Sequence, residues 1–236
     1  MKDFFRGKRM LITGGAQRVG AYMAEFFAAC GATVLIHANK SVEQAKDLAA
    51  KINGECYFCD LEKVDELESF FAKFGRVDIL INNASCYEVS PLADESISSM
   101  FKHYRTNFIA PVVLAQCMKK QALADSVILN ILDREISLHT PDKGSYLLSR
   151  KSLADATLEL AAELAPLQIR VNGLAPGSVL APVFMPEKAM IKTIAASPLK
   201  RTATLDDLCE CAAVLIANRS LTGQILQIDA GQHLIF

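Results

Sequence analysis

The stretch TGGAQRVG, Thr13 to Gly20, is the first segment whose residue types could do chemistry, and it follows the apolar run RMLI. A tight turn of this kind between a strand and a helix lets the backbone approach a pyrophosphate. The helix N-terminus adds unpaired N–H groups and the positive end of its dipole. We interpret Thr13–Gly20 as a dinucleotide-binding turn. An ordinary tight strand-to-helix connection is the alternative, because a single glycine-rich turn has low specificity.

Polar residues in and after this turn indicate which dinucleotide it binds. Arg18 stands where a glycine is expected. A cation at a helix N-terminus opposes the dipole by about 0.3–1 kcal/mol, so Arg18 indicates a nearby anion, unless it is a solvated surface arginine. An NAD site places an acidic residue about 20 residues after the turn. Here the chain reads Ala38-Asn39-Lys40-Ser41. The missing acid, with Lys40 and Ser41 available to a 2′-phosphate, favours NADPH.

Alternating strands and helices must position these residues. Strands are predicted over 9–13, 33–38, 55–59, 77–83, 126–132, 169–176 and 224–229, and helices over 21–30, 42–52, 99–122 and 151–164. Several strands are apolar on both faces, as in a parallel sheet covered by helices. The pattern predicts an α/β fold, a Rossmann-type doubly wound parallel sheet of about seven strands flanked by helices. No flexible linker divides the chain, so we expect one domain over 1–236.

One irregular, proline-containing stretch, 177–200, interrupts this alternation. Long loops in compact domains are usually functional or mobile, so we interpret it as a substrate lid. An ordered surface excursion is the alternative.

Composition excludes several classes of protein. A net charge of −1 gives no general attraction to nucleic acid or anionic membrane, and no run approaches the roughly 18 apolar residues of a membrane span. The N-terminal MKDFFRGKRM has no apolar core of a secretory signal. The seven cysteines show no spacing suited to a metal or a redox pair. We expect buried free thiols in a reducing cytoplasm, and no bound metal.

Further motifs follow in a characteristic order: NNAS (82–85), Asn107 in RTNFIAP, Tyr146 in YLLSRKSL, PG (176–177) and LTGQILQIDAG (221–231). Their joint order and spacing resemble the short-chain dehydrogenase/reductase family over essentially the whole chain. The resemblance implies that Tyr146 is the general acid in reduction and that Asn107 kinks its helix and holds a water in a proton relay. Taken singly, Asn107 could be a helix-surface amide and Tyr146 a core aromatic. The implied cofactor-binding residues are Thr13, Gly14, Arg18, Val19, Gly20, Asn39, Lys40, Ser41, Asp60, Leu61, Asn83, Ala84, Ser85, Pro176, Gly177 and Ser178.

Two residues depart from the family pattern. Asp133, thirteen residues before Tyr146, stands where most members carry a serine that binds a substrate carbonyl. A carboxyl suits the ring N–H and amino donors of a pterin, although a strand-end aspartate capping a turn is the alternative. Arg150 stands where the family has a lysine that holds the nicotinamide ribose and lowers the pKa of the tyrosine. Arg150 keeps the charge but never deprotonates, and Lys151 lies about 140° around the helix from Tyr146 and points away.

Arg18, HANKS, NNASCY, Asp133 and ELAPLQIRVNGLAPGSVL together resemble pteridine reductases and dihydromonapterin reductases. This resemblance implies an NADPH-dependent reductase of a dihydropterin or dihydrofolate, in which Tyr87 stacks on the pterin. The implied catalytic residues are Tyr146, Asp133, Arg150 and Asn107, and the implied substrate contacts are Arg18, Ser85, Tyr87, Asp133 and Tyr146. The alternatives are a carbonyl or 3-oxoacyl-thioester reductase and, because of Arg150, a non-catalytic NADP(H)-binding protein. The family implies a homotetramer formed through 99–122 and 151–164.

Overall fold

A seven-stranded sheet organises the computed structural model, which describes residues 2–180, 191 and 194–235. The strands follow the order β3-β2-β1-β4-β5-β6-β7, and all six pairings are parallel. This confirms the predicted Rossmann-type doubly wound sheet. The strands are β1 (Arg9–Ile12), β2 (Thr33–Ala38), β3 (Glu55–Phe58), β4 (Ile79–Asn82), β5 (Val127–Ile131), β6 (Arg170–Pro176) and β7 (Ile225–Ile228).

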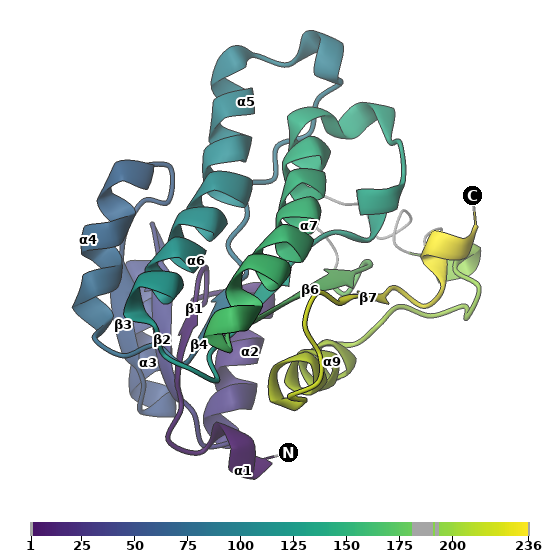
Figure 1. The fold of residues 1–236 in the computed structure, drawn as a ribbon. Helices are drawn as coiled ribbons and strands as arrows, with labels where there is room; N and C mark the ends of the chain where they lie inside the picture. Colours follow the sequence, from purple (N-terminus) through teal and green to yellow (C-terminus); the bar gives the residue numbers. More distant parts are fainter. Residues whose placement is uncertain (1, 181–190, 192–193, 236) are drawn as a thin grey trace.

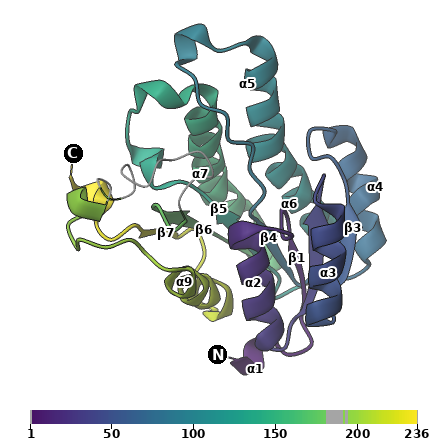
Figure 2. The same ribbon diagram turned by 180° about the vertical axis from the view of Figure 1, so that it is seen from behind.

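Helices cover both faces of the sheet (Figures 1 and 2). One apolar core joins the sheet to α2 (Arg18–Ala29), α3 (Val42–Ile52) and α9 (Leu205–Ala217). The other joins it to α4 (Leu67–Phe71), α6 (Ala110–Gln121) and α7 (Gly144–Leu164). The remaining helices are α1 (Lys2–Phe5) and α5 (Ile97–Tyr104). Both faces are buried, which is why the strands are apolar throughout instead of alternating.

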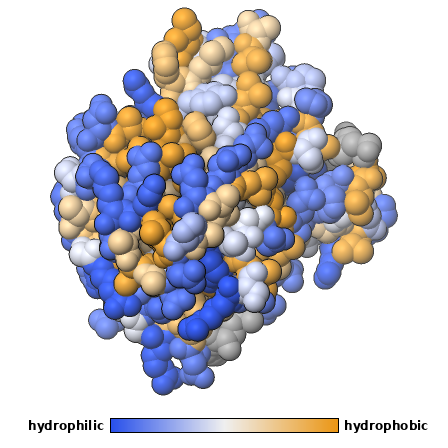
Figure 3. Space-filling model, in the orientation of Figure 1, coloured by the Kyte–Doolittle hydropathy of each residue, from blue (hydrophilic) through white to orange (hydrophobic). Residues whose placement is uncertain are grey.

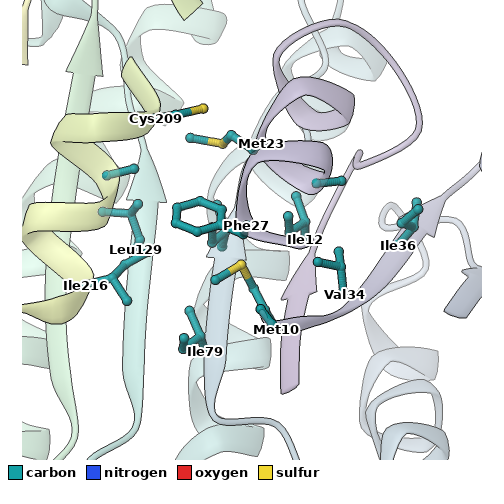
Figure 4. Packing of buried hydrophobic residues seen from close by; sticks show 14 of the residues in the cluster. Met10, Ile12, Met23, Phe27, Val34, Ile36, Ile79, Leu129, Cys209 and Ile216 are labelled. Carbon is teal, nitrogen blue, oxygen red and sulfur yellow. The ribbon is translucent and has the colours of Figure 1, made fainter. Parts of the chain in front are cut away.

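The side chains of β1 show how one strand serves both cores. Met10 and Ile12 belong to the core under α2, whereas Leu11 belongs to the core under α4 and α6. Side chains on a strand alternate between faces, so neighbouring residues enter different cores. In Figure 4, Phe27 of α2 fills the space between the sheet and Ile216 of α9. This packing holds α2 against the sheet, and the glycine-rich turn connects β1 to this helix.

Short 3₁₀ turns fill the connections, at Val64–Glu66, Ala72–Phe74, Leu92–Asp94, Arg134–Ser137, Pro141–Lys143, Ala165–Leu167 and Gln232–Leu234. The predicted helix 99–122 is wrong as one continuous α-helix, because the π-helical turn Arg105–Ile109 separates α5 from α6. Pro111 lacks an N–H group and therefore forms no helical hydrogen bond to the carbonyl of Asn107 four residues earlier. The π turn accommodates this break.

Two other helix boundaries also differ from the sequence prediction. The helix predicted from residue 21 begins at Arg18, and the one predicted from 151 begins at Gly144. Half of the predicted lid 177–200, residues 181–190 and 192–193, lies outside the described residues. None of the helices in the described part of the chain is long and apolar enough to cross a membrane.

The seven cysteines are all free thiols, as predicted. The expectation that they are buried is correct for Cys117 and Cys209 and wrong for the other five, which are partly accessible. Cys209 points toward Met23 across the interface between α9 and α2 (Figure 4).

Candidate active site

A cleft of about 1000 Å³ opens at the carboxyl ends of β1, β2 and β4. The strand order reverses between β1 and β4, and the crevice at such a switch point is where open α/β sheets bind ligands. The lining residues are Gly14, Gln17, Arg18, Val19, Gly20, His37, Asn39, Lys40, Asp60, Leu61, Glu62, Asn83, Ala84, Ser85, Cys86, Tyr87, Val89, Lys102 and Thr106.

The glycine-rich turn packs closely against the end of β4. Gly14 has a φ of +62°, and a Cβ atom there would lie 3.0 Å from the Cα of Ala84. A Cβ on Gly20 would collide with the carbonyl oxygen of Gly14 and would lie 2.7 Å from Nδ2 of Asn83. Thr13 is buried, and its hydroxyl accepts hydrogen bonds from the backbone N–H groups of Asn83 and Ala84, each at 3.0 Å. The two glycines therefore allow the turn, the start of α2 and the end of β4 to pack in direct contact, which a side chain at either position would prevent.

Arg18 is the first residue of α2 and lines the cleft. Its φ of 52° lies in the left-handed region, which glycine occupies without strain. In the sequence, Arg18 is unusual because it places a positive charge in the glycine-rich turn. In the structure, its backbone conformation is also unusual for a residue with a Cβ atom.

The end of β2 forms another side of the cleft. Asn39 and Lys40 line it, whereas Ser41 precedes α3 and is not part of the lining. Across the cleft, Asp60 and Leu61 line it after β3, and a carboxylate oxygen of Asp60 accepts the N–H of Glu62 at 3.1 Å.

His37 links the two sides of this end of the cleft. Its Nδ1 accepts the N–H of Gly14 at 3.1 Å, and its Nε2 lies 3.1 Å from the carbonyl oxygen of Cys59, to which it donates. Burial lowers the pKa of His37 to about 4, so the ring is neutral at pH 7, as these two bonds require. A lone histidine near the end of the apolar strand TVLIHA is a signal that sequence reasoning passed over.

Tyr146 and Asp133 meet beside the cleft. The phenolic hydroxyl of Tyr146 donates a hydrogen bond to Oδ2 of Asp133 at 2.8 Å. The other carboxylate oxygen accepts the N–H of Glu135 at 2.9 Å, so Asp133 also caps the following turn, as the alternative reading of the sequence proposed. The ring of Tyr87, which lines the cleft, makes an edge-to-face contact with the Tyr146 ring at 4.7 Å.

Arg150 lies under Tyr146, one helical turn further along α7. It is 3% exposed, its Nη1 donates to the carbonyl oxygen of Ile131 at 3.0 Å, and its guanidinium carbon lies 5.8 Å from the centre of the Tyr146 ring. Its Nε is buried without a hydrogen-bond partner among the described residues. Burial raises the pKa of Tyr146 well above its usual value, Arg150 lowers it and Asp133 raises it further. Tyr146 is therefore protonated at neutral pH and able to donate.

Asn107 is fully buried in the π turn and holds the segment that leads to Tyr87. Its side chain accepts the N–H of Cys86 at 2.8 Å and donates to the carbonyl oxygen of Cys86 at 3.0 Å and to the hydroxyl of Ser149 at 3.1 Å. The side-chain amide thus connects the cleft wall to α7. Lys151 donates to the carbonyl oxygen of Leu138, away from the cleft.

The structure divides the expected site residues into two groups. Most of the expected cofactor residues line the cleft, whereas Thr13, Ser41, Pro176, Gly177 and Ser178 do not. Gly177 packs at the end of β7, where its N–H donates to the carbonyl oxygen of Ile228 at 2.9 Å. Tyr146, Asp133 and Arg150 form a second cluster, which Tyr87 connects to the cleft.

Several lining residues were missed by sequence reasoning: Gln17, His37, Glu62, Cys86, Val89, Lys102 and Thr106. Lys102 of α5 forms an ion pair with Glu88 and so brings a cation to the cleft wall. Lys102 and Thr106 lie five and one residues before Asn107, so their signal in the sequence is their closeness to that residue.

A parallel sheet with a glycine-lined cleft at its switch point, and a buried tyrosine beside that cleft, defines a dinucleotide-binding protein of the Rossmann type. A family model described as Enoyl-(Acyl carrier protein) reductase, from the short-chain dehydrogenases/reductases, matches residues 14–233. Pteridine reductase 1 of Leishmania tarentolae is 27% identical over 95% of this chain and 96% of its own length. An uncharacterized oxidoreductase of Thermotoga maritima is 28% identical over 96% of this chain and 98% of its own length.

Among solved structures, FolM alternative dihydrofolate reductase 1 from Brucella canis, complexed with NADP, has a TM-score of 0.92 and 31% sequence identity, over 99% of this chain and 96% of that chain. The chain belongs to the short-chain dehydrogenase/reductase family and is an oxidoreductase that uses a nicotinamide cofactor. These matches confirm the family resemblance seen in the sequence motifs.

Proposed function

We propose that this oxidoreductase uses NADPH to reduce a pteridine of the dihydropterin or dihydrofolate type. The observation that carries the proposal is the hydrogen bond of 2.8 Å between the Tyr146 hydroxyl and Asp133. It pairs a proton donor with a carboxylate, where a simple carbonyl reductase of this family has a serine.

The cleft residues fit NADPH. Gly14 and Gly20 line the cleft and hold the turn tightly against the end of β4, which places the start of α2 where its backbone can approach a pyrophosphate. Lys40 and Arg18 line the cleft, and the segment 38–41 carries no carboxylate that would repel a 2′-phosphate. The Brucella canis relative was solved with NADP. When bound, NADPH supplies the hydride for reduction of a ring C=N bond.

The residues beside the cleft provide the rest of the chemistry. Tyr146 holds the proton that the substrate nitrogen receives as the neighbouring carbon is reduced, and its raised pKa keeps that proton in place until reaction. The carboxylate of Asp133 is an acceptor for the ring N–H and amino groups of a pterin. Tyr87 is half exposed at the cleft wall, so its ring is available to cover a planar substrate.

The relatives support this substrate class. Pteridine reductase 1 and the alternative dihydrofolate reductase of Brucella canis have names that state an activity on a pteridine, and both matches cover nearly the whole chain. We further propose that residues 1–236 form one catalytic domain and that this domain assembles as a homotetramer. We also propose that the protein acts in the cytoplasm, because its seven free thiols are stable in a reducing compartment.

The test is NADPH oxidation, followed at 340 nm, with dihydrobiopterin, dihydromonapterin, dihydrofolate, an acetoacetyl thioester and an enoyl thioester. We expect turnover with at least one dihydropterin, a preference for NADPH over NADH, and loss of turnover in Tyr146→Phe with NADPH binding retained. Asp133→Ser should lower activity on the pterin more than on the thioester. Turnover confined to the thioesters, or NADPH binding without turnover on any substrate, would exclude the proposal.

A further inference from the structure

A compact group of charged side chains, Arg134, Glu135 and Lys143, lies next to Asp133. Glu135 is buried, and its carboxylate accepts from Arg134 at 2.9 Å, from Thr140 at 2.8 Å and from Lys143 at 2.9 Å. The Nζ of Lys143 also lies 3.9 Å from Oδ2 of Asp133. Two carboxylates and two cations thus balance each other in the segment that joins β5 to α7.

The same oxygen of Asp133 serves both neighbours. Oδ2 accepts the hydrogen bond of Tyr146 at 2.8 Å and forms the ion pair with Lys143. Tyr146 is 6% exposed, whereas the side chain of Lys143 is 19% exposed. Tyr146, Asp133 and Lys143 therefore form a chain of contacts from a buried hydroxyl to a lysine that reaches solvent.

The position of Lys143 in the chain does not stabilise the helix that follows it. Lys143 immediately precedes α7, where a cation opposes the helix dipole. Its side chain turns to Asp133 and Glu135, and a carboxylate oxygen of Glu95 accepts the N–H of Ser145 in the first turn instead. The lysine is thus directed at the carboxylate that binds Tyr146.

The reaction creates a requirement that Arg150 cannot meet. Once Tyr146 has given its proton to the substrate, a buried phenolate stands beside the Asp133 carboxylate, and it must regain a proton before the next turnover. Arg150 does not release a proton, and its Nη1 is bound to the carbonyl oxygen of Ile131. The side-chain amide of Asn107 is bound to Cys86 and Ser149.

We propose that Lys143 is a positioning residue of this site. Acting through Asp133, it supplies Tyr146 with an ammonium charge and a proton. In the family, both come from the lysine at the position that Arg150 occupies here. The inference rests on the proposed reduction. Tyr146 passes its proton to the substrate nitrogen as the hydride reaches carbon. The Lys143 ammonium closes from 3.9 Å to hydrogen-bond distance and gives a proton to Oδ2 of Asp133, and the carboxylic acid formed in this way gives that proton to the phenolate. The neutral amine then takes a proton from water, so each turnover consumes one hydride and one proton.

The experiment compares Lys143→Gln, Lys143→Arg and the control Lys120→Gln, which removes an exposed ion pair to Glu68 of 2.7 Å far from the site. We expect Lys143→Gln to lower kcat about 100-fold, the lower end of the contribution of a placed proton donor. NADPH binding, followed by cofactor fluorescence, should stay near the wild-type value, and the solvent deuterium isotope effect on kcat should increase. Tm should decrease, because the buried Glu135 carboxylate loses one of its two cations. Lys120→Gln should change none of these quantities.

Lys143→Arg separates charge from proton supply. Arginine keeps the ion pairs to Asp133 and Glu135 but does not release a proton, so we expect wild-type stability and substrate KM with kcat still reduced. Methylammonium should increase the kcat of Lys143→Ala and leave that of Lys120→Gln unchanged. A purely structural role would instead give full recovery in Lys143→Arg. That recovery, or a wild-type kcat in Lys143→Gln, would overturn the proposal.

Two further outcomes distinguish this inference from the proposed function. If the wild type turns over a carbonyl substrate and no pterin, the substrate class is wrong, and the same variants test Lys143 on that substrate, because a C=O bond also needs the proton of Tyr146. If Arg150→Lys raises kcat 10-fold or more, about 1.4 kcal/mol, and Lys143→Gln then has no effect, position 150 is the proton source and the Lys143 proposal fails. NADPH binding without any turnover overturns both.

Discussion

Arg18 combines two properties in one residue, a cation at the cleft and a left-handed backbone. Its φ of 52° costs a residue with a Cβ atom roughly 1–2 kcal/mol. We expect Arg18→Ala and Arg18→Gly each to raise the Kd for NADPH about 10-fold, because both remove the contact that we propose between Arg18 and a cofactor phosphate. The two variants should differ in stability. Glycine relieves the strain and should raise Tm, whereas alanine keeps it.

Differential scanning calorimetry and a fluorescence titration with NADPH measure the two effects of the Arg18 variants separately. Equal Tm values for the two variants would show that the backbone at position 18 is unstrained. NADPH affinity retained in both would show that Arg18 does not contact the cofactor.

His37 makes the stability of the fold depend on pH. Its pKa is about 4 in the folded protein because the ring is buried, and about 6.5 in the unfolded chain. Below pH 6.5 the unfolded chain binds a proton that the folded protein does not, so the free energy of unfolding falls as the pH decreases. The slope from this group approaches about 1.4 kcal/mol per pH unit between pH 6 and 4.

Urea unfolding at pH 7, 6 and 5 checks this expectation against His37→Gln, whose side chain keeps hydrogen-bonding groups and does not titrate. The variant should be less stable at pH 7, where the bonds to Gly14 and Cys59 are intact in the wild type. Its stability should decline less steeply toward pH 5. Parallel curves for the two proteins would show that His37 carries no titration effect.

At the scale of elements, the start of α7 is fixed by a carboxylate from another segment. A Cβ on Gly144 would lie 2.5 Å from Oε2 of Glu95 and 2.5 Å from the carbonyl oxygen of Ser90, and the φ of Gly144 is +39°. Gly144→Ala must displace Glu95 from the N–H of Ser145, which lies directly before Tyr146. We expect Gly144→Ala to lower the free energy of unfolding by about 3 kcal/mol or more, because it strains the backbone and also breaks a buried contact.

Gly75→Ala is the matched control for Gly144→Ala. Gly75 has a φ of +63° with no atom within 4 Å of the added Cβ, so it reports backbone strain alone. We expect a cost of about 1 kcal/mol and an unchanged kcat for this control. Gly144→Ala should also lower kcat, because Tyr146 moves with the first turn of α7. Similar costs and rates for the two variants would contradict the role of Glu95 at this helix end.

The elements show which parts of the fold a sequence can predict. All seven strands lie within two residues of their predicted bounds, because each buried strand is a short apolar run between polar turns. The family resemblance implies a kink at Asn107 within 99–122, and the structure has a π turn there, between α5 and α6, which the helical pattern alone does not predict. Its local signal is Pro111, but the π geometry depends on the buried bonds of Asn107 to Cys86 and Ser149.

Part of the candidate active site could also be predicted from the sequence. The family resemblance, in which the position thirteen residues before the tyrosine binds substrate, implied that Asp133 and Tyr146 share a site, and the structure brings the two side chains to 2.8 Å. Lys143 and His37 were not found. Lys143 reaches Asp133 only through the conformation of the 3₁₀ turns before α7, and His37 acquires its role from the carbonyl oxygen of Cys59, beyond the end of β3. Neither contact has a fixed sequence spacing.

At the scale of the whole molecule, we expect the outer surfaces of α6 and α7 to form the contact between subunits of the proposed tetramer. A groove of about 330 Å³ runs between them, lined by Phe108, Val112, Ala115, Gln116, Lys119, Ala156, Glu159, Leu160, Glu163 and Leu164. Leu158 of α7 is 46% exposed and Phe101 of α5 is 57% exposed. On this face, hydrophobic side chains interrupt the hydrophilic surface (Figure 3). Apolar surface of this kind marks contact with another chain when it forms a continuous patch.

Leu158→Glu tests the assembly without disturbing the core, because the side chain already reaches solvent in the single chain. We expect the wild type to sediment as a tetramer and Leu158→Glu to sediment as dimers or monomers, since the change places four charges in the repeated interface. Phe58→Glu, at the end of β3 and 38% exposed, is the control and should leave the sedimentation coefficient unchanged. Circular dichroism should show equal helix content in all three proteins. A monomeric wild type, or a tetrameric Leu158→Glu, would exclude α7 as the contact between subunits.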